Sequence, residues 1–129
     1  MFDAVPGALL SRSDVERCLG YIRELSASLS AEVRSLSPDV WAGPTNCPPW
    51  QVRDIVAHLV TSGDGFRQSV ERGLAGTLAP PSSADRERRQ EELVASAPSV
   101  VADALDAHVA PRQGATWWDP WIVRSSLAC

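Results

Sequence analysis

Apolar residues that recur every three or four positions, in three separate stretches, constrain the fold of this chain most strongly. The first stretch follows Ser13 and is stopped by Pro38. Its periodic positions are Val15, Leu19, Ile22, Leu25, Leu29, Val33 and Leu36. Because this spacing puts side chains on one face of a helix, it predicts an amphipathic α-helix. Ser13 and Glu16 have the spacing of a capping box at its start.

The second periodic stretch predicts a helix from about Pro49 to Arg72. Two consecutive prolines suit its first turn, and residues 45–47 lie near its cap. Its apolar stripe comprises Val52, Ile55, Leu59, Phe66 and Val70. Gly63 and Gly65 interrupt the stretch, and each glycine costs ~1 kcal/mol relative to alanine in a helix interior. We therefore expect either a bend there or close packing against the backbone.

The third stretch begins in the charged run at 85–92 and resumes an apolar pattern at Val101, Leu105 and Val109. Pro98 lies between these parts and predicts a break or sharp kink near Ser96. No alternating apolar pattern is long enough to indicate a sheet. A chain of 129 residues is about one domain in length. We therefore predict a single all-α helical domain over residues 1–129.

The charge and the cysteines narrow the functional classes. A net charge of −4 and a pI near 5.1 argue against binding to nucleic acid or to an anionic membrane. Residues 1–14 lack a basic segment followed by a long apolar run, and no apolar stretch is long enough to cross a bilayer, so we expect a soluble protein that is not exported. Cys18, Cys47 and Cys129 are odd in number and far apart, which is untypical of a disulfide framework. We expect a reduced, cytoplasmic protein.

His58 is the main candidate for a functional side chain. On a helical wheel it lies at the edge of the apolar stripe, on the same flank as Asp54, Thr61 and Ser62. Such a histidine can point into a pocket between helices, where helical bundles place metal ligands. It can equally be half-buried and hydrogen-bonded to Asp54 or to water. The spacing alone favours this second interpretation.

The other histidine and two cysteines provide rival candidates. We interpret His108 as a surface histidine near a helix C-terminus, while it remains the second candidate metal ligand. Cys47 has the place of an activated thiol, but about 16 Å of helix separates it from His58, which disfavours a catalytic pair. Cys18 is expected in the core, and Cys129 has no evident partner.

Five tryptophans gather at two places in the chain. Trp41 and Trp50 are expected to close one end of the bundle. Trp117, Trp118 and Trp121 are expected to pack over a bundle end, with a substrate pocket as the alternative.

Residues 41–59, WAGPTNCPPWQVRDIVAHL, resemble the signature of the mycothiol-dependent maleylpyruvate isomerase N-terminal family, part of the DinB-like superfamily. The resemblance runs from about Ser11 to the tryptophan-rich tail. It implies a DinB-like up-and-down helical bundle that binds metal. The chain stops where the fourth helix of such a bundle would begin, so we expect an incomplete domain that lacks most of that helix.

The same resemblance implies a function. His58 takes the place of the first of three ligands to a divalent metal, usually zinc, and the other two belong to the fourth helix. Mycothiol is the implied small-molecule thiol, used with a further substrate in isomerase or S-transferase chemistry. A catalytic zinc needs about three protein ligands, so whether this chain is an enzyme stays open. The alternative is a non-enzymatic truncated helical module that binds a protein partner or forms a homodimer through its uncovered apolar face.

Overall fold

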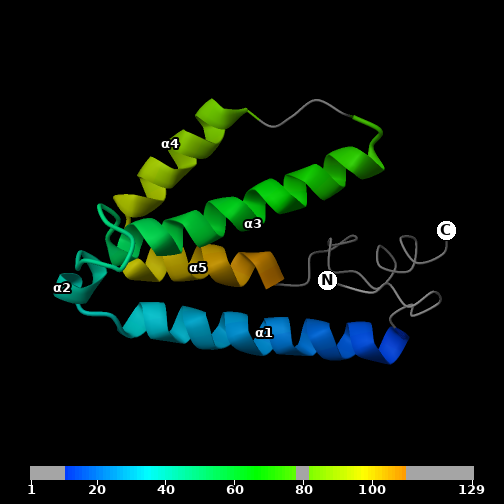
Figure 1. Cartoon of the computed structure of the whole chain (residues 1–129), viewed down its shortest axis with the longest axis horizontal. Helices are drawn as coiled ribbons and strands as arrows, with labels where there is room; N and C mark the ends of the chain where they lie inside the picture. The colour runs from blue at the N-terminus through cyan, green and yellow to red at the C-terminus, as the bar shows by residue number, and fades with distance from the viewer. Residues whose placement is uncertain (1–10, 78–81, 110–129) are drawn as a thin grey trace.

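The computed structural model describes residues 11–77 and 82–109 (Figure 1). These residues form five helices and an isolated β-bridge between Pro44 and Gln51. The helices are α1 (Arg12–Ser35), α2 (Pro38–Trp41), α3 (Val52–Leu74), α4 (Ser83–Val94) and α5 (Pro98–Val109). The predicted all-α helical bundle is therefore confirmed. The part of the prediction that concerns a fourth long helix falls outside the described residues.

The long helices lie side by side in the order α1, α5, α3 and α4, and the short α2 lies at one end (Figure 1). α5 packs between α1 and α3. α4 packs mainly against α3; the two helices are close at the C-terminal end of α4 and lie further apart toward its N-terminal end. The residues that form the buried core are Val33, Trp41, Val56, Ala57, Val60, Leu93, Val101, Ala102 and Leu105. Every long helix thus contributes to one core, which is centred on α5.

The break between α4 and α5 confirms the expected effect of Pro98. α4 ends at Val94, and Pro98 is the first residue of α5. Proline is tolerated at this position because the first N–H groups of a helix have no partner within it. The break lets α5 turn back between α1 and α3.

The buried face of α1 differs from the predicted stripe. Leu19 and Val33 are buried as expected, but Leu25 is 70% exposed. Ser30 is buried instead, and its hydroxyl donates a hydrogen bond to the carbonyl oxygen of Ala102 at 3.4 Å. Small side chains at this contact allow α5 to approach α1 closely. The apolar stripe of α1 is wider than the surface that α5 covers. The apolar side chains at the outer edge of the stripe are therefore exposed.

The buried face of α3 also differs from the predicted stripe. Leu59 and Phe66, expected at the core, are 43% and 56% exposed. The buried residues of this helix are Val56, Ala57, Val60 and Thr61. α4 and α5 both pack against this set, because small and β-branched side chains let two helices approach the same backbone.

Both predicted helix starts need correction. The N-cap of α1 is Ser11, whose hydroxyl accepts from the N–H of Asp14 at 3.1 Å, while the Asp14 carboxylate accepts from the N–H of Ser11. The capping box therefore lies two residues earlier than Ser13 and uses Asp in place of Glu. α3 begins at Val52, after the paired prolines, because the loop that contains them closes on itself before the helix starts.

An ion-pair network joins α1 to α5. Arg34 Nη2 lies 2.6 Å from Asp103 Oδ1 and 2.8 Å from Asp106 Oδ2. The nearby Ser30 hydroxyl, and then the Arg34 guanidinium, stabilise the charged carboxylate and hold the pKa of Asp106 below its ordinary value of 3.8. Charge and packing thus specify the same pairing of these two helices. None of the helices described is both long enough and apolar enough to cross a membrane.

Candidate functional site

A closed loop between α2 and α3 places Trp50 beside the start of α3. The N–H of Val52 donates to the carbonyl oxygen of Gly43 at 3.1 Å, which joins the two ends of the loop. Inside it, the Thr45 hydroxyl donates to the carbonyl oxygen of Trp50 at 2.7 Å and accepts from the N–H of Cys47. The peptide bond between Pro48 and Pro49 is cis. These contacts hold the loop in one shape although most of its side chains are exposed.

His58 lies on α3 beside this loop. Its ring centroid is 5.2 Å from that of Trp50, with the two planes at 59°. The Nε2 atom is 3.4 Å from the Ser62 hydroxyl, which is a long hydrogen bond. Asp54, the alternative partner expected from the sequence, instead accepts from the N–H of Gln51 at 2.8 Å and caps the helix. His58 is thus an exposed imidazole with one weak polar contact. The half-buried interpretation is therefore wrong, and Asp54, one of the two partners considered for it, caps the helix instead.

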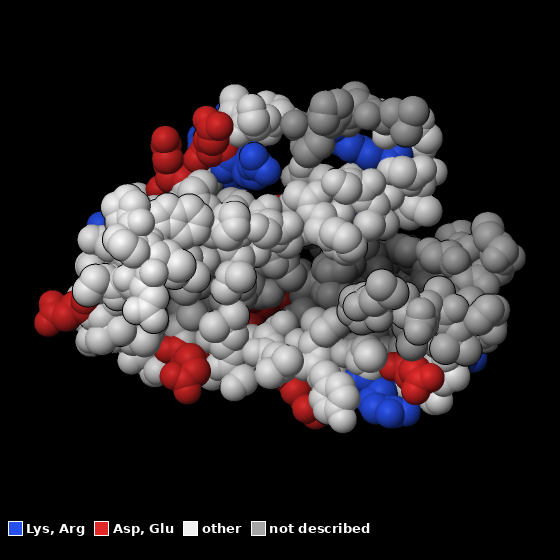
Figure 2. Space-filling view, viewed as in Figure 1, with Lys and Arg blue, Asp and Glu red and all other residues white. Residues whose placement is uncertain are grey.

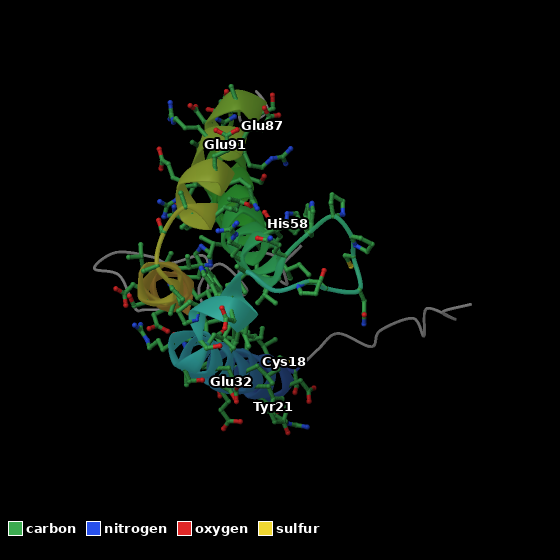
Figure 3. All side chains as sticks on the ribbon, turned by 90° about the vertical axis from the view of Figure 1, so that its left-hand side faces the viewer. Cys18, Tyr21, Glu32, His58, Glu87 and Glu91 are labelled. Atoms are coloured by element: carbon green, nitrogen blue, oxygen red, sulfur yellow. The ribbon has the colours of Figure 1, made fainter. Side chains whose placement is uncertain are left out.

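The exposed side of α3 carries His58 together with apolar side chains. In Figure 3, His58 lies on the side of α3 away from α5, the same side on which α1 displays Cys18 and Tyr21. Leu59 and Phe66 are exposed within the next two turns of α3. Cys18 is also exposed, so its predicted place in the core is wrong. The reason is that α1 packs against α5 through the side that bears Leu19, Ser30 and Val33, which leaves Cys18 exposed.

The described residues do not complete a metal site. Among them, no group of three or more histidine, cysteine, aspartate or glutamate side chains could hold a metal ion. A zinc centre generally requires about three or four such ligands. His58 therefore supplies one candidate ligand, and no catalytic step through a metal follows from the described residues.

His108 has a structural role that contradicts its interpretation as a surface residue. Its side chain is 14% exposed, and its Nε2 atom lies 2.9 Å from Oδ1 of Asp64 on α3. The ring also lies against Gly63, where an added Cβ would be 2.6 Å from Cε1 of the imidazole. The close packing that the mid-helix glycines predicted is confirmed at Gly63. The sequence alone could not show that His108 pairs with Asp64, because the two residues are 44 positions apart in the chain.

The remaining candidates divide between those that the structure describes and those that it does not. Cys47 is exposed in the loop. The loop residue whose ring lies beside His58 is Trp50. Trp41 is 6% exposed and closes the end of the core as predicted, whereas Trp50 is 39% exposed. Three tail tryptophans and the last cysteine fall outside the described residues; they are Trp117, Trp118, Trp121 and Cys129.

Comparison with known proteins relates this arrangement to a family. The chain matches the Mycothiol maleylpyruvate isomerase N-terminal domain over residues 22–124. Its relatives include uncharacterized proteins from two strains of Mycobacterium tuberculosis, each 33% identical over 85 residues. The matched segment covers 66% of this chain and only 40% of each relative. No solved structure matches the chain.

The family match covers most of the chain, including the loop with Trp41 and Trp50 and the helix with His58. The helical fold agrees with it. This chain belongs to the mycothiol maleylpyruvate isomerase N-terminal domain family.

Proposed function

We propose that this chain is a divalent-metal-binding helical domain that serves thiol-dependent isomerase or transferase chemistry, with His58 as one metal ligand. The observation that carries the proposal is the exposed imidazole of His58, held beside Trp50 and not engaged by any described carboxylate. Zinc as the metal and mycothiol as the thiol rest on family membership alone. A cytoplasmic location and small-molecule partners remain predictions from the sequence.

The neighbours of His58 suit a ligand role. Histidine ligands are generally oriented by a hydrogen bond to the ring nitrogen that does not bind metal. The Ser62 hydroxyl is 3.4 Å from Nε2, and the indole of Trp50 lies beside the ring, with the two centroids 5.2 Å apart. A hydroxyl on one ring nitrogen leaves the second nitrogen to bind a cation.

Zinc binding tests this assignment directly. We expect the wild-type chain to bind Zn²⁺ in competition with a chromophoric chelator, and His58→Ala to bind at least about tenfold more weakly, since the loss of even an outer-shell partner costs 10–100-fold. His108→Gln is the matched control, because it removes the other histidine while leaving a polar side chain near Asp64. Circular dichroism checks that both variants remain folded. Absence of zinc binding by the wild type, or equal affinity for His58→Ala, would contradict the proposal.

A second candidate function is a non-enzymatic module that associates with another copy of itself. The observation that favours it is a set of exposed apolar side chains on α1 and α3. They are Leu25 (70% exposed), Leu29 (36%), Leu59 (43%) and Phe66 (56%). None of the described helices covers these side chains, and exposed apolar surface that gathers on one face is typical of association sites.

The mass in solution tests self-association. Light scattering coupled to size-exclusion chromatography should show the mass rising above 13.9 kDa as concentration increases. The double variant Leu25→Ser/Phe66→Ser should remain monomeric over the same range. Val100→Ser is the control, since Val100 is 50% exposed but lies on α5. A wild-type monomer at every concentration, or equal association by the double variant, would rule out this face.

A further inference from the structure

A pocket lies between α3 and α4, where the two helices diverge toward the start of α4 (Figure 1). Figure 2 shows basic atoms beside the hollow between these helices, while acidic atoms lie on the outer side of α4. Its volume is about 420 Å³. Small-molecule sites commonly have volumes of ~300–1,000 Å³, so the pocket is large enough for a small metabolite. His58 does not line it.

The contact between the two helices changes from apolar to polar along their length. At the closed end Leu93 is 1% exposed within the core. In the middle, Gln90 donates to the carbonyl oxygen of Asp54 at 3.0 Å and accepts from the Thr61 hydroxyl at 3.1 Å. Beyond Gln90, the side chains that line the pocket are polar or charged. These side chains offer hydrogen-bond donors and acceptors to a polar ligand.

The charges in the pocket leave an excess of positive character. Arg72, Arg86 and Arg89 line it together with Asp64 and Asp85. Groups outside the pocket engage both aspartates: His108 lies 2.9 Å from Asp64, and Arg88 lies 2.9 Å from Asp85.

The arginines of α4 have little compensation from the described protein. Arg86 makes no side-chain hydrogen bond or ion pair with any residue in the described part of the chain. Arg89 lies at 4.0 Å from Asp64 and 3.9 Å from Glu92, at the outer limit of an ion pair. Two guanidinium groups therefore share one side of a polar hollow, without a carboxylate in close contact with either.

We propose that this pocket binds a small dianionic molecule that carries a phosphate or two carboxylate groups. Guanidinium groups match both anions through paired N–H donors. The N-terminus of α4 lies at the same end of the pocket, and its dipole favours negative charge there. The ligand neutralises the facing arginines and holds α4 against α3. This site is separate from the one proposed around His58.

Titration with inorganic phosphate and, separately, with succinate tests the proposal on the full chain. Ionic strength is held constant with sodium chloride, and the melting temperature and amide NMR shifts are followed. We expect a saturable response to at least one anion. Arg86→Gln/Arg89→Gln should weaken binding at least about tenfold, because charge-assisted hydrogen bonds are lost. Arg23→Gln, which removes one exposed charge from α1, is the control and should bind as the wild type does.

The two anions identify the chemistry of the ligand. Saturation by phosphate alone indicates a phosphate monoester, saturation by succinate alone a dicarboxylate, and saturation by both a general dianion site; each supports the proposal. A response that does not saturate overturns it. So does equal binding by the double variant, if its circular dichroism shows wild-type helix content.

Discussion

Leu93→Ala is expected to lower the free energy of unfolding by ~2–5 kcal/mol, the range for deleting a buried leucine side chain. Leu93 is 1% exposed and is the residue of α4 that enters the core. Its loss would leave a cavity where α4 contacts α3. Because α4 packs mainly against α3, we expect this helix to detach first. Urea denaturation followed by circular dichroism measures the change.

Leu74→Ala is the matched control for this experiment. It makes the same chemical change at the end of α3, where the side chain is 59% exposed. Surface substitutions of this kind usually alter stability by less than about 0.5 kcal/mol. If both variants lost similar stability, the observed packing of α4 on α3 would be wrong.

Gly63→Ala is expected to destabilise the protein by up to about 2 kcal/mol. The new Cβ would lie 2.6 Å from Cε1 and 2.7 Å from Nδ1 of His108, so the ring must move. Overpacking typically costs ~1–3 kcal/mol, which the better helix propensity of alanine offsets by ~1 kcal/mol. Movement of the ring would also disturb its contact with Asp64. Thermal and urea unfolding measure the net effect.

Gly65→Ala provides the control on the same helix. A Cβ at this position meets nothing within 4 Å, so the helix propensity of alanine should stabilise the protein by up to ~1 kcal/mol. In the double variant Gly63→Ala/His108→Ala the steric conflict disappears, and a double-mutant cycle should show positive coupling. Equal stabilisation by both single glycine substitutions would show that the His108 ring does not pack on Gly63.

Local signals predicted the helices well because they depend on neighbouring residues. The periodic apolar positions, the proline between α4 and α5, and the glycine at 63 each correspond to an observed feature. Errors of a few residues at the starts of α1 and α3 arose because two serines compete for one cap and because the loop before α3 closes on itself.

The faces of the helices were predicted less well. Leu25 and Phe66 belong to regular apolar stripes, and yet both are more than half exposed. An apolar stripe indicates that part of a helix surface can be buried. It does not indicate which neighbouring helix covers that surface. The side chains that are buried at the contacts include Ser30, Ala57 and Thr61, because small residues let backbones approach.

The candidate site also has features that a local motif predicted and features that depend on how the helices pack. The Trp41 to Leu59 motif indicated the family and singled out His58, and the family is confirmed. The role of His108 was missed because its partner, Asp64, comes from another helix. The α3–α4 pocket was missed for the same reason, since the arginines of two helices become neighbours only when those helices pack.

The sequence by itself determined the all-α class, the approximate extent of each helix and the family, since periodicity, helix breakers and a contiguous motif are local properties of the chain. Only the tertiary structure decided which sides of α1 and α3 are buried, that His108 pairs with Asp64, and that arginines gather in a pocket. These depend on which helices become neighbours, and that choice is made by the packing of small side chains far apart in the chain.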